Sequence, residues 1–207
     1  YINRPFDAGI VCRRVFNTVK LYAKQRRLVS LMMAHINERE KNNHMMIDIQ
    51  SHIVEFRNGE SGKHVFHMDK VIQLLLDKIV QKTDKYPSLW QERILIRTAS
   101  ALHDIGKIGI DEAILNKPGR LTAEEFESMK AHTTIGADML RNLPRYQEER
   151  ILQIAIEICR WHHERYDGKG YPDGLVGDEI PISAQLVSIA DVYDACLLYT
   201  SDAADEE

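Results

Sequence analysis

Apolar residues recur at intervals of three and four along most of this 207-residue chain, and this spacing constrains the possible folds more than any other feature. Residues at these intervals share one face of an α-helix, whereas a core strand would alternate apolar and polar residues. No stretch of the sequence alternates strongly enough for a core strand. The helical pattern covers Ile10 to Val19, Leu21 to Phe56, His64 to Val80, Gln147 to His163 and Ser183 to Ala195. We therefore expect an all-α protein whose helices pack into a bundle.

Composition limits the class of protein. With 44% hydrophobic and 28% charged residues, the chain is ordinary for a soluble globular protein. Its formal charge of -4 argues against a basic surface that coats a nucleic-acid polymer. No apolar run approaches the ~20 residues that cross a bilayer. Three distant cysteines, Cys12, Cys159 and Cys196, indicate neither a disulfide framework nor a Cys-rich zinc site. We expect a cytoplasmic protein that binds neither nucleic-acid polymers nor membranes.

One break in the periodicity divides the chain. The stretch Arg57 to Gly62 contains two glycines and an asparagine, which mark a turn. We expect the main domain to span residues 56–195 and residues 23–55 to form one or two long linker helices. The linker is either a coiled coil, through which two copies of the chain would form a homodimer, or a connector that packs on the main domain.

Two positions carry the residues of a capping box. Ser88 is followed three residues later by Gln91, and Thr122 is followed by Glu125. In this motif the hydroxyl of the first residue and the side chain of the fourth each accept a hydrogen bond from the other residue's backbone N–H. We therefore expect helices to begin after Ser88 and after Thr122, the first of which leads to His103.

Side chains that bind metals are concentrated in the main domain. They are Glu60, His64, His103, Asp104, His132, His162, His163 and Asp191. Taken singly, each has a simpler explanation, because a His-Asp pair often makes a helix-end hydrogen bond and an isolated histidine is most often a surface or capping residue. However, His162 and Asp191 fall within apolar helical stretches, where an unpaired polar group is costly. We expect these residues to satisfy one another through metal ions.

The ligand types indicate hydrolytic chemistry. Imidazoles combined with carboxylates suit iron, manganese or zinc, and the absence of thiolates excludes a site of the zinc-finger type. Adjacent residues on a helix project about 100° apart, so His162 and His163 are expected to serve different ions. A carboxylate such as Asp104 can bridge two ions, which share a water, lower its pKa and clamp a phosphodiester. Redox chemistry would require iron and access for oxygen.

Three separated segments resemble the HD-GYP family in order and spacing. They are His103-Asp104-Ile105-Gly106-Lys107, the run from His162 to Pro172, and Ala190 to Ala195. The resemblance covers roughly residues 56–195 and implies an HD-domain-like helical bundle after the long linker helix. Members of this family are metal-dependent cyclic dinucleotide phosphodiesterases, which mostly hydrolyse cyclic di-GMP to linear pGpG or GMP. The resemblance therefore implies an enzyme with this substrate.

The resemblance also implies a role for each candidate ligand. The matches to the metal quartet of HD-type hydrolases are His64, His103, Asp104 and Asp191. The matches to the ligands of a second ion are His132, His162 and His163. Glu60 matches a position that helps to hold a third ion in some members, so two or three divalent ions, iron or manganese, are implied.

Two further features carry over from the family. Lys107 matches a catalytic lysine near the scissile phosphate, beside the catalytic Asp104. The loop with Gly170, Tyr171 and Pro172 borders the active site in the family and is linked to partner recognition. We therefore expect this loop to contact substrate and, as a second hypothesis, diguanylate cyclase domains.

The two ends of the chain differ from the main domain. Residues 1–22 resemble the last part of a response-regulator receiver domain, in which a basic residue followed by Pro-Phe closes the phosphorylation site; Arg4 stands where a lysine is usual. Residues 196–207 depart from the HD-GYP pattern, because Thr200 and Ala203 stand where basic residues would hold a substrate phosphate. This tail resembles the translation of a sequencing adaptor, and we expect it to be non-native.

Three functions remain open from the sequence. The first is the phosphodiesterase effector of a two-component response regulator. The second is a signalling module that binds a cyclic dinucleotide or a protein partner without turnover, which the absence of the basic residues near the C-terminus would favour. The third is an HD hydrolase for another phosphate ester, against which the Gly-Tyr-Pro loop argues.

Overall fold

Helices are the regular elements of the part of the chain that the structure, a computed structural model, describes. That part comprises residues 7–57 and 64–204, and the side chains at positions 40, 43, 44, 48, 55 and 198–204 are not described. Within it the one pairing of extended residues is an isolated bridge between Asp167 and Val176. The expectation of an all-α fold is therefore confirmed.

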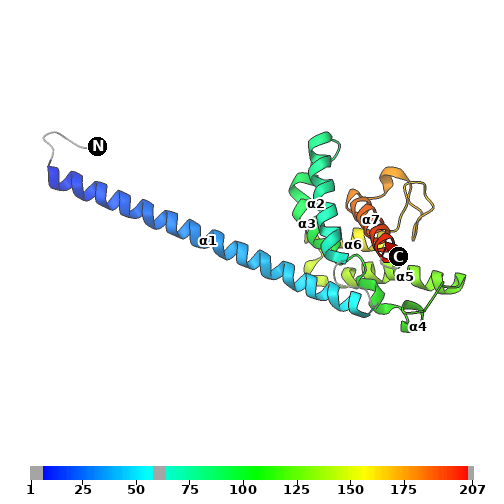
Figure 1. Ribbon diagram of the computed structural model, residues 1–207. Coiled ribbons are helices and arrows are strands. Elements are labelled where there is room, and N and C mark those ends of the chain that lie inside the picture. Colours follow the sequence, from blue (N-terminus) through cyan, green and yellow to red (C-terminus); the bar gives the residue numbers. More distant parts are fainter. Residues whose placement is uncertain (1–6, 58–63, 205–207) are drawn as a thin grey trace. The chain divides into compact units, whose positions relative to one another are not determined.

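The helices follow one another along the chain, and a long loop, residues 162–176, separates α6 from η3 (Figure 1). Their bounds are α1 Ala8–Arg57, α2 His64–Lys82, α3 Leu89–Ser100, η1 Ile105–Gly109, α4 Glu112–Leu115, α5 Ala123–Arg141, η2 Pro144–Tyr146, α6 Arg150–Trp161, η3 Gly177–Glu179 and α7 Ile182–Ala204, where η marks a 3-10 helix. None of the described helices is both long and apolar enough to span a membrane.

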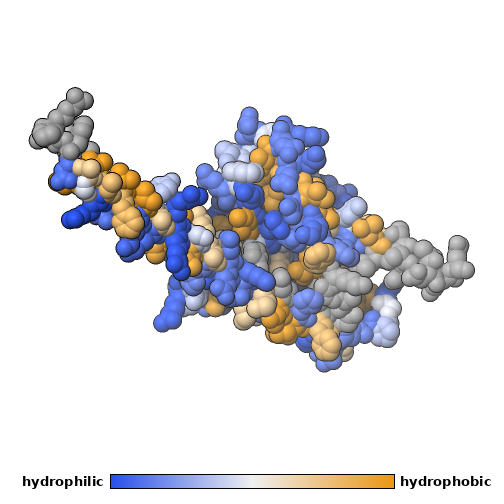
Figure 2. Space-filling view, turned by 60° about the vertical axis from the view of Figure 1, so that its left-hand side comes forward, coloured by the Kyte–Doolittle hydropathy of each residue, from blue (hydrophilic) through white to orange (hydrophobic). Residues whose placement is uncertain are grey.

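Helix α1 is one uninterrupted helix of 50 residues, not two. Residues 1–45 and 46–207 form separate compact units, so the last turns of α1 belong to the same unit as the main domain. In the first unit, large apolar side chains such as Phe16 and Met32 are exposed, and Figure 2 shows apolar residues interspersed with hydrophilic ones along this helix. The first unit is thus a helix whose apolar side chains face solvent.

The core of the second unit lies between α2, α3, α5, α6 and α7. It contains the fully buried side chains of Ile72 in α2, Ile96 in α3, Ile158 in α6 and Leu186 in α7. Burying each large aliphatic side chain contributes about 1.5–3 kcal/mol relative to leaving it in water. This packing fixes the C-terminal ends of α3 and α6 and the middle of α7, next to which His103, His162, His163 and Asp191 lie.

The 3-10 helix η1 lies against α5 at a distance that only glycine allows. A Cβ atom on Gly106 would lie 1.9 Å from the backbone oxygen of His132 and 2.5 Å from the backbone nitrogen of Gly136. A larger residue at position 106 would push the two backbones apart. The glycine in the His-Asp-Ile-Gly motif therefore brings the segment with Asp104 against the helix that carries His132.

Several helix boundaries differ from the expected ones. The capping box at Thr122 and Glu125 is confirmed, with both hydrogen bonds present. The one at Ser88 is wrong: its backbone is already helical, at φ -79° and ψ -16°, and its side chain makes no capping bond. A capping residue needs an extended backbone for its hydroxyl to reach the following N–H groups. The expected helix 147–163 is shorter, at Arg150–Trp161, and a 3-10 turn that begins at Pro144 precedes it.

Candidate metal centre

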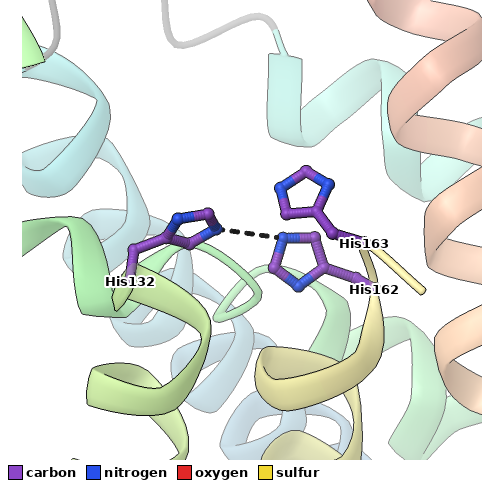
Figure 3. Close-up of side chains that lie close together, drawn as sticks. All are labelled: His132, His162 and His163. Atoms are coloured by element: carbon purple, nitrogen blue, oxygen red, sulfur yellow. Dashed lines mark hydrogen bonds between the residues drawn. The ribbon is translucent and has the colours of Figure 1, made fainter. Parts of the chain in front are cut away.

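Three histidines from two helices form the first group of potential ligands, which we call the all-histidine triad. His132 lies on α5, whereas His162 and His163 follow the last residue of α6 (Figure 3). One nitrogen atom from each residue lies within 4.8 Å of those of the other two. The Nε2 atoms of His132 and His162 are 3.4 Å apart, and the rings of His162 and His163 have centroids 4.0 Å apart. The triad therefore converges on one point.

The backbone sets the direction of two of these rings. The Nδ1 atom of His132 lies 2.7 Å from the backbone oxygen of Met129, and Nδ1 of His162 lies 3.0 Å from that of Ile158. A carbonyl accepts only from a protonated nitrogen, so Nδ1 carries the proton and Nε2 keeps its lone pair. Both Nε2 atoms are therefore prepared to bind a metal ion.

His64, His103 and Asp191 form a second group, the mixed triad. His64 begins α2, His103 follows α3 and Asp191 lies in the middle of α7. One ligand atom from each lies within 4.8 Å of the others, and His64 Nε2 is 3.4 Å from Asp191 Oδ1. His103 is 2% exposed, and its Nδ1 donates to the backbone oxygen of Ser100 at 2.9 Å.

Asp104 lies between the two triads. Its Oδ2 is 3.1 Å from Nε2 of His103, whereas its Oδ1 is 3.4 Å from Nε2 of His132 and 3.9 Å from Nε2 of His162. One carboxylate thus turns an oxygen toward each triad. The ring centroids of His103 and His162, one from each triad, are 5.2 Å apart, so the triads are neighbours.

The charge of the site differs between its histidines. Burial opposes the charged form of His103, but the carboxylate of Asp104 outweighs this effect and raises its pKa to about 9. Burial lowers the pKa of His162 to about 3, aided by the charge of His103. Burial and His162 lower the pKa of His163 to about 2, and burial also lowers that of His132. At neutral pH the all-histidine triad is thus uncharged, which is the form that binds metals.

The ligand atoms at the centre of the site are of the kinds that bind divalent metal ions. At the centre of the site, Oδ1 of Asp104 is buried without a hydrogen-bond partner, and Nε2 of His103 has no well-formed hydrogen bond beyond its 3.1 Å ion contact with the carboxylate of Asp104. Leaving such atoms unpaired is costly, so their presence calls for an explanation. The imidazole and carboxylate groups around them are the ligands of iron, manganese and zinc. A metal ion at this point would satisfy both atoms.

The expectation that His162 and His163 serve different ions disagrees with the geometry. The 100° separation applies within a helix, but α6 ends at Trp161, and both histidines lie in the turn that follows. There the backbone lets the two rings face each other and join the same group. Both histidines therefore lie in the all-histidine triad with His132.

Two further carboxylates support the site and were missed in the sequence. Asp194 is 1% exposed, and its two oxygens lie 2.6 Å from Nδ1 of His64 and 2.9 Å from Nδ1 of His67. It therefore orients the ring of His64 so that Nε2 faces Asp191. Carboxylates behind ligating histidines commonly act in this way. The only signal in the sequence was the position of Asp194 three residues after Asp191, on the same helix face.

Glu164 holds the loop of the Gly-Tyr-Pro motif. Its buried carboxylate accepts hydrogen bonds from the backbone N–H groups of Asp173, Gly174 and Leu175, at 2.7, 3.0 and 3.0 Å. Gly170 lies so close to this residue that a Cβ atom there would be 2.4 Å from the Cα of Glu164. As a result Tyr171 packs beside His163, with ring centroids 4.8 Å apart. The loop therefore borders the site beside His163, and Pro172 is the residue that follows Tyr171 in this loop.

The remaining candidates divide into described and undescribed positions. Lys107 lies on η1, and its ammonium is 2.8 Å from Oδ2 of Asp104, so it reaches the centre of the site. Glu60, the candidate ligand of a third ion, lies outside the described residues. The side chains at Thr200 and Ala203 are likewise outside them, although both positions are within α7.

Comparison with known proteins identifies one protein family and several relatives that resemble this chain. The model of the HD domain family matches residues 26–204. The cyclic di-GMP phosphodiesterase response regulator RpfG of Xanthomonas campestris pv. campestris is 37% identical over 80% of this chain and 41% of its own length. A cyclic di-GMP phosphodiesterase of Thermotoga maritima is 43% identical over 72% of this chain and 38% of its own length.

A third relative differs in the substrate that its name gives. The 3'3'-cGAMP-specific phosphodiesterase 2 of Vibrio cholerae is 36% identical over 82% of this chain and 32% of its own length. This chain therefore spans less than half the length of each of these three relatives. The helical fold, the two converging triads and the match over residues 26–204 together show that the chain belongs to the HD domain family.

Proposed function

We propose that this chain is the effector part of a response regulator and that it hydrolyses cyclic di-GMP to linear pGpG or GMP. The observation that carries the proposal is the position of Asp104, whose two oxygens face different triads. Such an arrangement suits a pair of divalent ions acting on a phosphodiester. The names of two relatives, one of them a response regulator, support the choice of substrate.

The chain's own residues have distinct roles in this proposal. His64, His103, Asp104 and Asp191 would hold one ion, and Asp104 with the all-histidine triad would hold the other. Bound there, divalent ions supply a water of lowered pKa and stabilise the charge that develops on the phosphate. Lys107, next to Asp104, places a positive charge where it can offset that of a substrate phosphate. Tyr171 limits the site on the side of His163.

The test of this activity compares two substrates. Purified protein loaded with Mn²⁺ is incubated with cyclic di-GMP and, separately, with cyclic GMP-AMP, and the products are separated by chromatography. We expect pGpG or GMP from cyclic di-GMP, and far slower product formation by the Asp104→Asn variant. Faster turnover of cyclic GMP-AMP would reassign the substrate. Tight binding of either nucleotide without turnover would instead support the non-catalytic signalling module.

The metal content is a further part of the proposal. We infer two ions, iron or manganese, because nitrogen and carboxylate ligands suit both, and a third ion would require Glu60. Metal analysis of protein purified from cells supplied with iron or manganese tests this. Two equivalents, unchanged in Glu60→Gln, would support a two-ion site, whereas three equivalents that fall to two would show the third.

We also propose that the linker helix forms a homodimer. Val15, Tyr22, Val29 and Ile36 recur every seven residues on α1, and their side chains are 57%, 62%, 50% and 47% exposed. Apolar residues at this interval form the seam of a coiled coil. Light scattering should show a dimer for the wild type and a monomer for Val29→Glu. If the wild-type protein is a monomer, the proposed homodimer is wrong.

The proposal also includes a protein partner and a cellular location. Diguanylate cyclase domains are proposed as partners of the Gly-Tyr-Pro loop, whose neighbours Tyr166 and Val176 are 66% and 54% exposed. Calorimetric titration with such a domain, comparing wild type and Tyr166→Ala, tests this. A cytoplasmic location is supported by the free state of Cys12, Cys159 and Cys196, and fractionation of cells that express the protein would test it.

A further inference from the structure

The last two turns of α1 are bonded to the segment that carries His103, Asp104 and Lys107. The buried hydroxyl of Ser51 donates to the backbone oxygen of Ala101 at 2.5 Å, two residues before His103. At the other end, the guanidinium of Arg57 donates to the backbone oxygens of Lys107, Ile108 and Ile110, at 3.1, 2.6 and 2.8 Å. The segment 101–110 is therefore anchored to α1 at both ends.

The contacts of Arg57 depend on the shape of its side chain. η1 ends at Gly109, where the last carbonyl groups of a helix lack partners within it, although the oxygen of Lys107 also accepts from the backbone N–H of Ile110. A guanidinium presents five N–H donors in a planar fork, so one side chain can serve three carbonyls, whereas an ammonium is a compact point charge. Arg57 is itself held, because the side chain of Asn116 donates to its backbone oxygen at 3.0 Å. The end of α1 and the end of η1 thus form one bonded unit.

This bonded unit packs the segment 101–110 closely against the rest of the site. On one side, Gly106 lies against the backbone of His132 in α5. Between the segment and the end of α1, the cavity lined by residues including Ser51, Val54, His103 and Asp104 is only about 10 Å³, too small for more than one water. The position of Asp104 between the triads is therefore set by the contacts of its segment with α5 and with the end of α1.

We propose that Arg57 is a positioning residue for the metal centre: it acts through the backbone of η1 to hold Asp104 and Lys107 at the point where the two triads meet. Ser51 assists at the other end of the segment. This proposal rests on the proposed function, because it gives the end of the linker helix a part in setting the activity of the same site. A change in the position of α1 would then reach Asp104 through these four hydrogen bonds.

The test uses Arg57→Ala and three readouts on the full chain. Hydrogen exchange of the metal-free protein should rise in residues 101–110 and stay unchanged in α6. Calorimetric titration should show Mn²⁺ affinity lower by about 10–100-fold, the usual effect of losing a group that orients metal ligands. With cyclic di-GMP as substrate, kcat should fall while KM stays near that of the wild type.

Matched variants separate positioning from a general loss of stability. Arg57→Lys keeps the charge but not the fork, so its Mn²⁺ affinity should lie between those of wild type and Arg57→Ala. Ser51→Ala removes one hydrogen bond and should show a smaller rise in exchange in the same segment. Arg93→Ala is the control, because the hydrogen bond and the ring contact of the Arg93 side chain are both with Trp90 in its own helix; it should match the wild type.

Two results would overturn the proposal. One is wild-type exchange in residues 101–110 together with wild-type Mn²⁺ affinity in Arg57→Ala. The other is an equal rise in exchange in all helices of the second unit, which would show that Arg57 only stabilises the fold. If the wild type hydrolyses no cyclic dinucleotide, the proposed function fails, but exchange and Mn²⁺ affinity still decide the role of Arg57.

Discussion

The two triads differ in charge although they share Asp104. The all-histidine triad is neutral, because burial lowers the pKa of His162 to about 3 and that of His163 to about 2. The mixed triad contains Asp191, has Asp194 behind His64, and includes His103, whose pKa is raised to about 9. Burial therefore keeps the histidines of the all-histidine triad neutral, whereas the adjacent carboxylate of Asp104 outweighs burial at His103. The comparison teaches that one small site can offer two metal positions with different dependence on pH and on supporting groups.

The largest effect is expected where the two triads meet. Asp104→Asn keeps the shape of the side chain but removes the charge that both triads face. Loss of this ligand should cost about 4 kcal/mol of transition-state stabilisation, or roughly 1000-fold in kcat. Steady-state kinetics and metal analysis measure it. If Asp104→Asn keeps both ions and a rate within tenfold of the wild type, Asp104 does not link the two metal positions.

Removing one ligand from each triad tests whether the triads are independent. His162→Gln should lose one equivalent of metal and keep the other, and His64→Gln should do the same for the opposite position. The physical reason is that each histidine belongs to one triad only. Metal analysis after dialysis measures the loss. If either variant loses both equivalents of metal, the two triads form a single cooperative site and do not bind their ions independently.

A supporting residue sharpens the comparison, because the mixed triad alone has Asp194 behind it. Asp194→Asn should weaken one of the two Mn²⁺ binding events by about 10–100-fold and leave the other unchanged. The cause is a less firmly oriented His64 ring. Calorimetric titration with Mn²⁺ measures both events. Asp178→Asn, which alters an exposed ion pair with Lys85, is the control and should leave both events unchanged.

The smallest expected effect is on the pH dependence of metal-free protein stability. His162 and His163 have lowered pKa values, so only the unfolded chain takes up their protons, and stability falls as pH drops below about 6.5. His103 has a raised pKa, so its contribution is complete below about 6.5 and is lost as pH rises toward 9. The alkaline slope, which comes from one histidine, should be about 1.4 kcal/mol per pH unit, and the acid slope, which comes from two, should be up to about twice as steep.

Urea unfolding of the metal-free protein at pH 5, 7 and 9 measures both slopes. His162→Gln should flatten the acid side, and His103→Gln should flatten the alkaline side. Equal slopes in wild type and both variants would contradict the difference in charge between the triads.

The sequence alone predicted the features that depend on near neighbours. Helical periodicity identified the all-α fold, and the capping box at Thr122 was found because its partner, Glu125, is one turn away. His162 and Asp191 stood out because imidazoles and carboxylates are rare in apolar stretches, whereas the roles of the other ligand candidates were implied by the family resemblance. The structure brings the described ones together in two triads around Asp104.

Only the tertiary structure decided how distant segments meet. The contact of Asp194 with His64 spans 130 residues and that of Arg57 with Lys107 spans 50, and no local pattern encodes either. His162 and His163 share one triad because α6 ends just before them, and Ser88 fails as a cap because its backbone is already helical. The spacing of residues within a segment determines which helix or turn that segment can form. Hydrogen bonds between distant segments depend on how the whole core packs, and the sequence of one segment does not encode that packing.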